Sequence, residues 1–213
     1  MNRGLSKRYK MKERMETMTE EKSTQNDVFM IDRIEVKLPD LSTDQWILDI
    51  GGGGEGMIGR LKGASVVAID LSKSELEEAP PGPLKIIMDA ADLKFLDHTF
   101  MTATMFFSLM FMPNEKLEQV IGEVFRILSP GGVVHVWDGK FPVKGSNPAK
   151  YTGIELNVSM EGNVISTGYG RKWPDETLTI EYYDRLAGTC GFITKTISED
   201  NSWFYAQWIK PKS

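Results

Sequence analysis

The chain has few residues of the kinds that bind metals or form crosslinks. Among its 213 residues there are one cysteine, Cys190, and two histidines, His98 and His135. One cysteine cannot form an intramolecular disulfide, and it cannot build a zinc site that needs several thiolates. The sequence therefore predicts no metal site and is typical of a protein that works in a reducing compartment.

Long hydrophobic runs are also absent. No stretch approaches the roughly 20 apolar residues that a membrane-spanning helix needs. Residues 1–20 lack the apolar run that defines a secretory signal peptide. We therefore expect a cytoplasmic protein that does not contact membranes.

The chain has no excess of positive charge. Its 25 Lys and Arg against 30 Asp and Glu give a net charge of −5, so the molecule as a whole does not attract a phosphate backbone. This disfavours a nucleic-acid partner. Only residues 1–22 are locally basic, with seven basic and four acidic side chains. Because of this basic segment, RNA or protein remains an alternative substrate.

From residue 46 onward, short apolar runs alternate with helical patterns, which is typical of βα units that form a parallel sheet. The predicted strands span residues 46–50, 65–69, 84–88, 101–107 and 133–137. The predicted helices span residues 55–61, 73–78 and the region after Asn114, which has the side chain of an N-cap residue. We expect this third helix to end at Ser129–Gly132.

The parallel pattern stops after residue 139. Residues 154–160 and 164–168 predict a β-hairpin, and residues 175–186 predict a helix. Residues 192–198 and 203–209 predict two strands that pair antiparallel at the edge of the sheet.

These patterns divide the chain into two parts. Residues 1–43 form an N-terminal helical extension or cap. Two interpretations are open for residues 5–18: a basic helix over the cofactor cleft, and a frayed, solvated arm. Residues 44–213 form one domain with an inserted hairpin at about 153–169. We expect substrate selection in the stretches outside the sheet, 1–43 and 140–173, because loops beside a rigid scaffold usually carry specificity.

A run of glycines follows the first predicted strand. Gly51, Gly52, Gly53 and Gly54, with Gly56, lie between a strand and a helix. Glycine lets a ligand approach the backbone, and a helix N-terminus favours a phosphate or a carboxylate. The spacing also fits the G-x-G-x-x-G pattern, so NAD is an alternative ligand. A tight turn that binds nothing is the other alternative.

An aspartate stands at the end of each of the first three predicted strands: Asp49, Asp70 and Asp89. In an open parallel sheet, ligands bind beyond the carboxyl ends of the strands, so the three side chains should converge on one site. Asp70, 21 positions after Asp49, is suited to accept hydrogen bonds from the hydroxyls of a ribose. Its alternative role is that of a helix N-cap.

At these positions the chain resembles the class I S-adenosylmethionine-dependent methyltransferases. The matching segments are residues 46–51, 66–70, 88–93 with Phe95, and 128–132. The resemblance implies an α/β fold with a Rossmann-like, doubly wound sheet of seven strands in three α/β/α layers. The sheet would be mostly parallel, with an antiparallel final strand.

Two positions depart from the family pattern. Glu55 stands where the family usually has another glycine, which affects the path of the loop. Met101 stands where many relatives have an aspartate, at the start of a strand and far from the cofactor.

The resemblance implies S-adenosylmethionine as the cofactor, with S-adenosylhomocysteine as its product. Asp49 and the backbone of Gly51, Gly52 and Gly53 would border the methionine end of the cofactor. Asp70 would hold the ribose.

The resemblance also assigns the adenine end. Asp89 would accept a hydrogen bond from the adenine amino group, and Ala90 would present its backbone. Leu71 and Ala91 would flank the adenine ring. Phe106, at the end of the fourth strand, is a candidate aromatic neighbour of the positively charged sulfur.

Methyl transfer from a sulfonium depends mainly on alignment, so the lack of a catalytic triad does not argue against an enzyme. Asp138 and Lys140, just after the fifth strand, are the candidate bases if the acceptor must lose a proton. Ser108 is a candidate for orienting the acceptor. His98 is expected in an exposed turn, and His135 is expected as a hydrogen-bonded core residue on a buried strand. Neither is favoured as a catalytic base.

The sequence therefore predicts a methyltransferase that acts on a small molecule by in-line transfer. Members of the family that methylate amino groups often carry an Asn/Asp-Pro-Pro-aromatic motif, where this chain has Phe-Ser-Leu-Met at residues 107–110. Three alternatives remain: an RNA or protein methyltransferase, an NAD-binding oxidoreductase, and a module that binds S-adenosylmethionine without catalysis.

Overall fold

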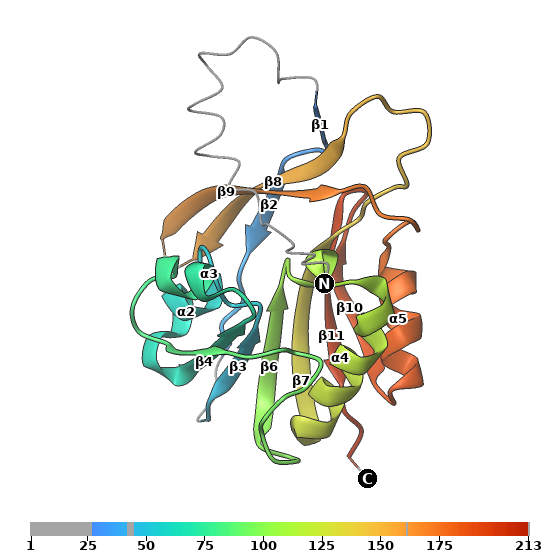
Figure 1. Cartoon of the computed structure of the whole chain (residues 1–213). Helices are drawn as coiled ribbons and strands as arrows, with labels where there is room; N and C mark the ends of the chain where they lie inside the picture. Colours follow the sequence, from blue (N-terminus) through green and yellow to red (C-terminus); the bar gives the residue numbers. More distant parts are fainter. Residues whose placement is uncertain (1–26, 42–44, 161, 213) are drawn as a thin grey trace, which may run out of the picture. The chain divides into compact units, whose positions relative to one another are not determined.

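The computed structural model describes residues 27–41, 45–160 and 162–212, and the fold is given for these residues (Figure 1). The basic helix predicted over residues 5–18 lies outside them. The chain forms two compact units. The larger consists of Asp40–Asp138 and the residues from Ile180 onward, and the smaller of the residues up to Pro39 with Gly139–Thr179.

The larger unit is built on a seven-stranded sheet with the order β10-β11-β7-β6-β3-β4-β5. In chain order these strands are β3 (Ile47–Ile50), β4 (Val66–Asp70), β5 (Leu84–Ile87), β6 (Phe100–Phe106), β7 (Leu128–Gly139), β10 (Ile193–Glu199) and β11 (Trp203–Ile209). The chain moves outward from β3 through β4 to β5 and then continues on the other side of β3 with β6. The sheet is therefore doubly wound, and its direction changes between β3 and β6.

Parallel pairing joins β5, β4, β3, β6 and β7, whereas β10 and β11 pair antiparallel. All four residues of β3 are buried, as expected for a central strand covered on both faces. These pairings confirm the predicted α/β class, the mostly parallel seven-stranded sheet and the reversed C-terminal strand.

The described residues of the larger unit contain four α-helices: α2 (Met57–Lys62), α3 (Lys73–Glu78), α4 (Asn114–Ile127) and α5 (Ile180–Thr189). Two short 3-10 turns are also present, η1 (Gly63–Ser65) and η2 (Leu109–Phe111). Asn114 is the first residue of α4 and Pro113 occupies the N-cap position, so the predicted capping role of Asn114 is wrong by one residue. The Nζ of Lys210 donates to the carbonyl oxygens of Phe125 and Leu128, both at 2.8 Å, and so satisfies the C-terminus of α4.

Helix α5 starts five residues later than the sequence predicts. Phe141 and Leu178 exchange two backbone hydrogen bonds, of 2.9 and 3.1 Å, as an antiparallel bridge. This pairing holds the chain extended at Leu178, so the helix begins at Ile180.

The two faces of the large sheet carry different elements. Tyr183 and Asp184 of α5 contact Phe204 and Trp208 of β11, which point to the same face. The glycine loop that leads into α2 packs over Ala68, since a Cβ on Gly52 would lie 3.0 Å from the Ala68 Cβ. Ala68 lies on the opposite face, because the paired residues Ala68, Asp49, Thr104 and His135 share one face and His135 contacts Tyr205, the neighbour of Phe204 in β11.

The smaller unit is a second sheet centred on β8 (Tyr151–Met160). On one side β8 pairs antiparallel with β9 (Asn163–Lys172), which is the predicted hairpin extended at both ends. On the other side it pairs parallel with β1 (Val28–Met30) and β2 (Ile34–Lys37). The described part of the predicted N-terminal helical extension therefore contains strands and no helix.

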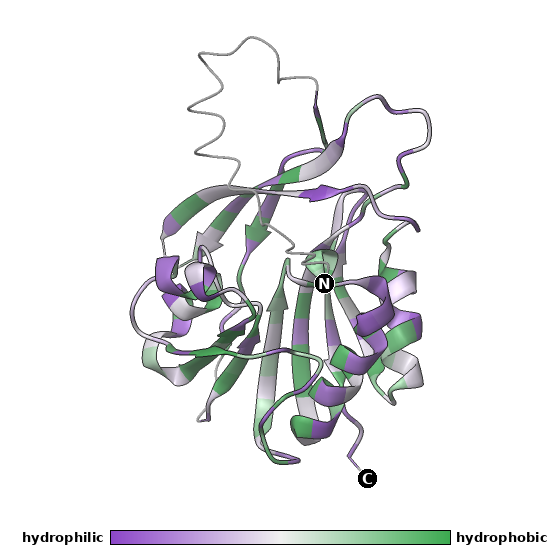
Figure 2. Ribbon diagram, in the orientation of Figure 1, coloured by the Kyte–Doolittle hydropathy of each residue, from purple (hydrophilic) through white to green (hydrophobic). Residues whose placement is uncertain are grey.

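The second sheet has one apolar and one polar face. Ile34 and Val36 of β2 are buried, whereas Glu35 and Lys37 between them are exposed, and the colours along β2 in Figure 2 alternate accordingly. On the polar face the amide of Asn157 donates to Glu35 (2.6 Å) and accepts from Ser166 Oγ (2.7 Å). This row of side chains joins β2, β8 and β9, and the period of two fixes the register of the three strands.

A histidine lies within an aromatic stack in the larger unit. His135 Nδ1 is 2.8 Å from the Tyr205 hydroxyl. The rings of Trp137 and Tyr205 are parallel, with centroids 4.5 Å apart. Burial lowers the pKa of His135 to about 4, because the charged imidazolium loses its hydration there. The predicted hydrogen bond of His135 is therefore confirmed, whereas its side chain is half-buried rather than part of the core.

We expect His135 to make the folded protein sensitive to acid. The unfolded imidazole has a pKa of about 6.5, so between about 6.5 and 4 the unfolded state binds a proton that the folded state does not. Stability is then full above about pH 6.5 and falls as the pH decreases towards 4. The loss in unfolding free energy between pH 7 and pH 5 should be about 2 kcal/mol.

The measurement is urea denaturation of the native protein and of His135→Gln at both pH values. The variant should lose less stability than the native protein by about 2 kcal/mol. His98→Gln, at the exposed turn, should behave like the native protein. Equal pH dependence in all three proteins would contradict the prediction.

Candidate functional site

The three strand-end aspartates lie on adjacent strands of the large sheet. Asp49 is on β3, Asp70 ends β4, and Asp89 follows β5 by two residues. The register pairs Asp49 with Ala68 and Asp70 with Ile87 in parallel ladders, so the three strands end at the same edge of the sheet. The sheet order thus gives the arrangement that the sequence predicts for a ligand site.

Asp49 is buried and held in one orientation. Its Oδ1 accepts a hydrogen bond of 2.8 Å from Thr104 Oγ1 on the neighbouring strand β6. Its Oδ2 would lie 2.5 Å from a Cβ added to Gly52. The carboxylate is therefore fixed between β6 and the glycine loop, at the point where the winding direction of the sheet changes.

The glycine loop is fastened to β4 and α3. The N–H groups of Gly51 and Gly52 both donate to the Ile69 carbonyl, at 2.9 and 3.0 Å. Gly54 N–H donates to the Glu75 carbonyl at 2.8 Å. A Cβ on Gly53 would lie 2.5 Å from the Glu75 Cβ and 2.9 Å from Asp70 Oδ2. The backbone there approaches its neighbours more closely than any side chain allows.

The loop path explains the departure at Glu55. Gly54 (φ 63°) and Gly56 (φ 55°) are left-handed, and Glu55 between them is not. A third glycine is therefore unnecessary at position 55. Gly56 also lets α2 begin immediately after the turn.

Asp70 joins the loop to the next helix. Its Oδ2 accepts from Gly53 N–H at 3.3 Å, and its Oδ1 accepts from Ser72 N–H at 2.9 Å. Ser72, rather than Asp70, is the N-cap of α3, since its side chain accepts from Glu75 N–H. Both carboxylate oxygens are thus oriented by backbone donors of the loop and of the start of α3. The neighbouring Leu71 is 66% exposed, an apolar surface beside this carboxylate.

Asp89 is held by a backbone donor and a lysine. Its Oδ1 accepts from Ala91 N–H at 2.9 Å, and its Oδ2 is 3.1 Å from Lys116 Nζ on α4. The Ala91 hydrogen bond, and to a smaller extent Lys116, lower the pKa of Asp89 below its ordinary value, against the opposing effect of burial. Among the described residues, Ala90 N–H has no hydrogen-bond acceptor. Asp89 thus supplies acceptors and Ala90 a donor at adjacent positions.

The ends of β6 and β7 carry aromatic rings and unpaired donors. The Phe106 ring lies 5.7 Å from Trp137. Phe107 is fully buried with φ 47°, a left-handed backbone that is costly for a residue other than glycine. Its N–H donates to the Trp137 carbonyl at 2.8 Å. Ser108 Oγ and Trp137 Nε1 are buried with no partner among the described residues, and buried donors are normally satisfied.

The three candidate catalytic residues have different surroundings. Asp138 is fully buried, and its Oδ2 accepts from Met110 N–H at 3.1 Å, which fixes the turn η2 after β6. Ser108 precedes that turn. Lys140 belongs to the smaller unit. The larger unit therefore brings Ser108 and Asp138 to neighbouring strand ends but does not contain Lys140.

Sequence reasoning missed Thr104 and Lys116, which contact Asp49 and Asp89. A threonine in an apolar strand and a lysine on a helix are common, so neither residue gives a signal by itself. The alternation of β6 does place Thr104 on the face of Phe106, but only the register shows that Asp49 is opposite it.

No group of three potential metal-ligating side chains occurs within the described chain. No helix in the described ranges is long and apolar enough to cross a membrane.

Gly53→Ala should weaken binding of S-adenosylhomocysteine about tenfold or more, because the new methyl group must displace the Asp70 carboxylate or α3. Isothermal titration calorimetry measures the dissociation constant. Gly188→Ala, a helical position on α5 with nothing within 4 Å of the added Cβ, is the matched control. Unchanged binding by Gly53→Ala would show that the ligand does not depend on this loop.

Part of the sequence matches a family of known proteins. Residues 48–136, which include the glycine loop and all three aspartates, match the family model described as a methyltransferase domain. This match favours S-adenosylmethionine over NAD as the ligand of the glycine loop. No curated protein sequence matches the chain significantly.

Solved structures share the fold. A SAM-dependent methyltransferase from Methanosarcina mazei is 20% identical, with a TM-score of 0.54 over 81% of this chain and 95% of that chain. The PH0226 protein of Pyrococcus horikoshii is 17% identical, with a TM-score of 0.55 over 96% and 93%. The [4+2]-cyclase SpnF is 16% identical, with a TM-score of 0.54 over 81% and 77%.

At these identities the solved structures support the architecture, and the family model supports a methyltransferase domain over residues 48–136. Both concern the same strands, loop and aspartates that the geometry brings together at one edge of the sheet. The chain thus contains a segment that matches the methyltransferase domain, and it shares the fold of solved S-adenosylmethionine-dependent methyltransferases.

Proposed function

We propose that the protein transfers the methyl group of S-adenosylmethionine to a small-molecule acceptor. The observation that carries this proposal is the set of three carboxylates on adjacent strand ends, two of them packed against glycines that have no room for a side chain. Such a surface suits a ligand that has a ribose, an amino group and a flat base. Bound there, the cofactor supplies an activated methyl group on a positively charged sulfur.

The residues of the chain would bind and orient rather than react. The Asp70 carboxylate would accept hydrogen bonds from the ribose hydroxyls, next to the exposed Leu71 side chain. Asp49, held by Thr104, would face the methionine end. Alignment of this kind accounts for about 7 kcal/mol or more of barrier reduction in well-oriented reactions, so a dedicated acid or base is not required.

The buried donors at the ends of β6 and β7 support an acceptor that carries an oxygen. Ser108 Oγ and Trp137 Nε1 have no partner among the described residues, and a carbonyl or hydroxyl oxygen would satisfy such donors. Asp138 suits a supporting role better than that of a base, because it is fully buried and already accepts a backbone hydrogen bond. Lys140 remains the other candidate base.

A small acceptor also agrees with the charge of the chain. The net charge of −5 gives no general attraction for nucleic acid. The fold neighbour described as a [4+2]-cyclase suggests a second candidate: binding of S-adenosylmethionine while a small molecule reacts without methylation. Release of S-adenosylhomocysteine distinguishes the two candidates, since only methyl transfer produces it.

Asp70→Ala should weaken binding of S-adenosylhomocysteine by about 1.5 to 3 kcal/mol, the range for hydrogen bonds to a charged group. Calorimetry gives the affinities directly. Asp32→Ala, at an exposed position in the smaller unit, is the control and should bind like the native protein. If the native protein binds neither S-adenosylmethionine nor S-adenosylhomocysteine, the proposed function is wrong.

Ser108→Ala should lower kcat/KM for the acceptor about two- to thirteenfold, which corresponds to one hydrogen bond of about 0.5 to 1.5 kcal/mol. Its affinity for S-adenosylhomocysteine should stay unchanged. The assay measures S-adenosylhomocysteine release across a panel of oxygen-containing small molecules. Loss of cofactor affinity with unchanged acceptor kinetics would place Ser108 at the cofactor instead.

A further inference from the structure

The loop between β5 and β6, residues 88–99, has no helix or strand of its own. It contains Asp89, Ala90 and Ala91, the residues proposed for the adenine end of the cofactor. Inside the loop, Asp92 N–H donates to the Asp89 carbonyl at 3.0 Å. A segment without regular structure needs other partners for its buried polar groups, and most of them come from α4.

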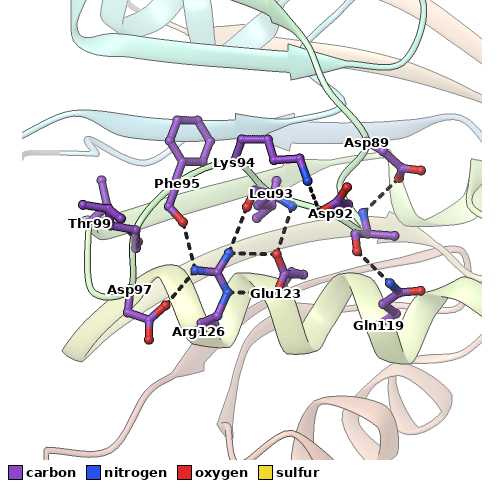
Figure 3. A network of polar contacts seen from close by, with 12 residues as sticks. Asp89, Asp92, Leu93, Lys94, Phe95, Asp97, Thr99, Gln119, Glu123 and Arg126 are labelled. Carbon is purple, nitrogen blue, oxygen red and sulfur yellow. Dashed lines mark hydrogen bonds and ion pairs between the residues drawn. The ribbon is translucent and has the colours of Figure 1, made fainter.

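Four polar side chains form a stripe along one side of α4: Lys116, Gln119, Glu123 and Arg126. Their spacing of three and four residues places them on one face of the helix. Lys116 contacts Asp89, Gln119 Nε2 donates to the Ala91 carbonyl at 2.8 Å, and Glu123 Oε2 accepts from Leu93 N–H at 2.9 Å. This α4 polar stripe meets every second residue of the loop, and most of these contacts appear in Figure 3.

Arg126 makes the largest contribution to the stripe. Its guanidinium donates to the carbonyls of Leu93 and Phe95, both at 2.9 Å, and to Asp97 at 2.7 Å. It also donates twice to Glu123, at 2.8 and 2.9 Å. All five N–H groups of the guanidinium are therefore used. Glu123, followed by Asp97, raises the pKa of Arg126 above its ordinary value.

These contacts fix both ends of the adenine segment, which consists of Asp89, Ala90 and Ala91. β5 and the hydrogen bond from Met88 N–H to the Asp70 carbonyl (3.1 Å) hold its start. Leu93 holds its end, because Glu123 binds its N–H and Arg126 binds its carbonyl. The buried Ala91 lies between them and donates to Asp89. The directions of the Asp89 carboxylate and the Ala90 N–H therefore depend on α4.

We infer that Arg126 and Gln119 are positioning residues that set how strongly the site distinguishes adenine from a base without the exocyclic amino group. The inference rests on the proposed function. Adenine presents an amino donor beside a ring-nitrogen acceptor, which matches the Asp89 acceptor and the Ala90 donor. Hypoxanthine presents the reverse pattern, a carbonyl acceptor beside an N–H donor. A site built on hydrogen bonds rejects a ligand that leaves them unpaired only while its groups keep their positions.

The test compares the dissociation constants of S-adenosylhomocysteine and S-inosylhomocysteine, measured by calorimetry. We expect the native protein to prefer the adenosyl compound strongly. Arg126→Ala should reduce this preference about tenfold, and Gln119→Ala, which removes one hydrogen bond from an exposed side chain, about threefold. Arg185→Ala on α5, an exposed arginine over the Tyr182 ring, is the matched control and should keep the native preference.

Each outcome separates this inference from the proposed function. If the native protein binds neither compound, the proposed function fails. If it binds and discriminates, and both Arg126→Ala and Gln119→Ala keep the native ratio, the inference is wrong and the function stands. A role in stability alone would lower the melting temperature and weaken both compounds equally, and that result would also overturn the inference. Gln119→Ala keeps the test decisive if Arg126→Ala does not fold.

Discussion

The close approach of a backbone without side chains to two carboxylates is the constraint on which the site depends. Gly52 and Gly53 lie against Asp49 and Asp70, and at both positions a Cβ would come within 3 Å of an aspartate oxygen. Because glycine has no side chain, the loop backbone comes close enough to hydrogen-bond to β4 and α3. Its other surface is then available to a ligand. β3, β4 and α3 each supply one side of this contact, through Asp49, Asp70 and Glu75.

A carboxylate held by a hydrogen bond from a neighbouring residue recurs at each aspartate. Thr104 fixes Asp49, Ser72 N–H fixes Asp70, and Ala91 N–H fixes Asp89. Preorganised acceptors of this kind lose little freedom when a ligand binds. Helix α4 has two functions in this scheme. Its buried apolar side supports the sheet, and its polar stripe holds the loop that has no regular structure.

Much of the larger unit could be predicted from the sequence, because its signals are local. Each aspartate follows an apolar run directly, so its place at a strand end needs no long-range information. The second sheet could not be predicted in the same way. Strands β1 and β2 are only three and four residues long, and their partner β8 lies more than 100 residues later in the chain. The start of α5 was missed because the pairing of Phe141 with Leu178 overrides local helix propensity.

The sequence by itself determined the order of strand, glycine loop and helix, the three aspartates, and the reversed strand pair at the C-terminus. It did so because hydrophobic period and turn residues act within a few positions of one another. Only the tertiary structure decided that Thr104 faces Asp49, that Lys116 faces Asp89, and that Arg126 uses all five donors on the loop and its own helix. Apart from the Arg126–Glu123 bonds within α4, these contacts join residues 27 to 55 positions apart. Strand register and helix packing, rather than local pattern, bring such residues together.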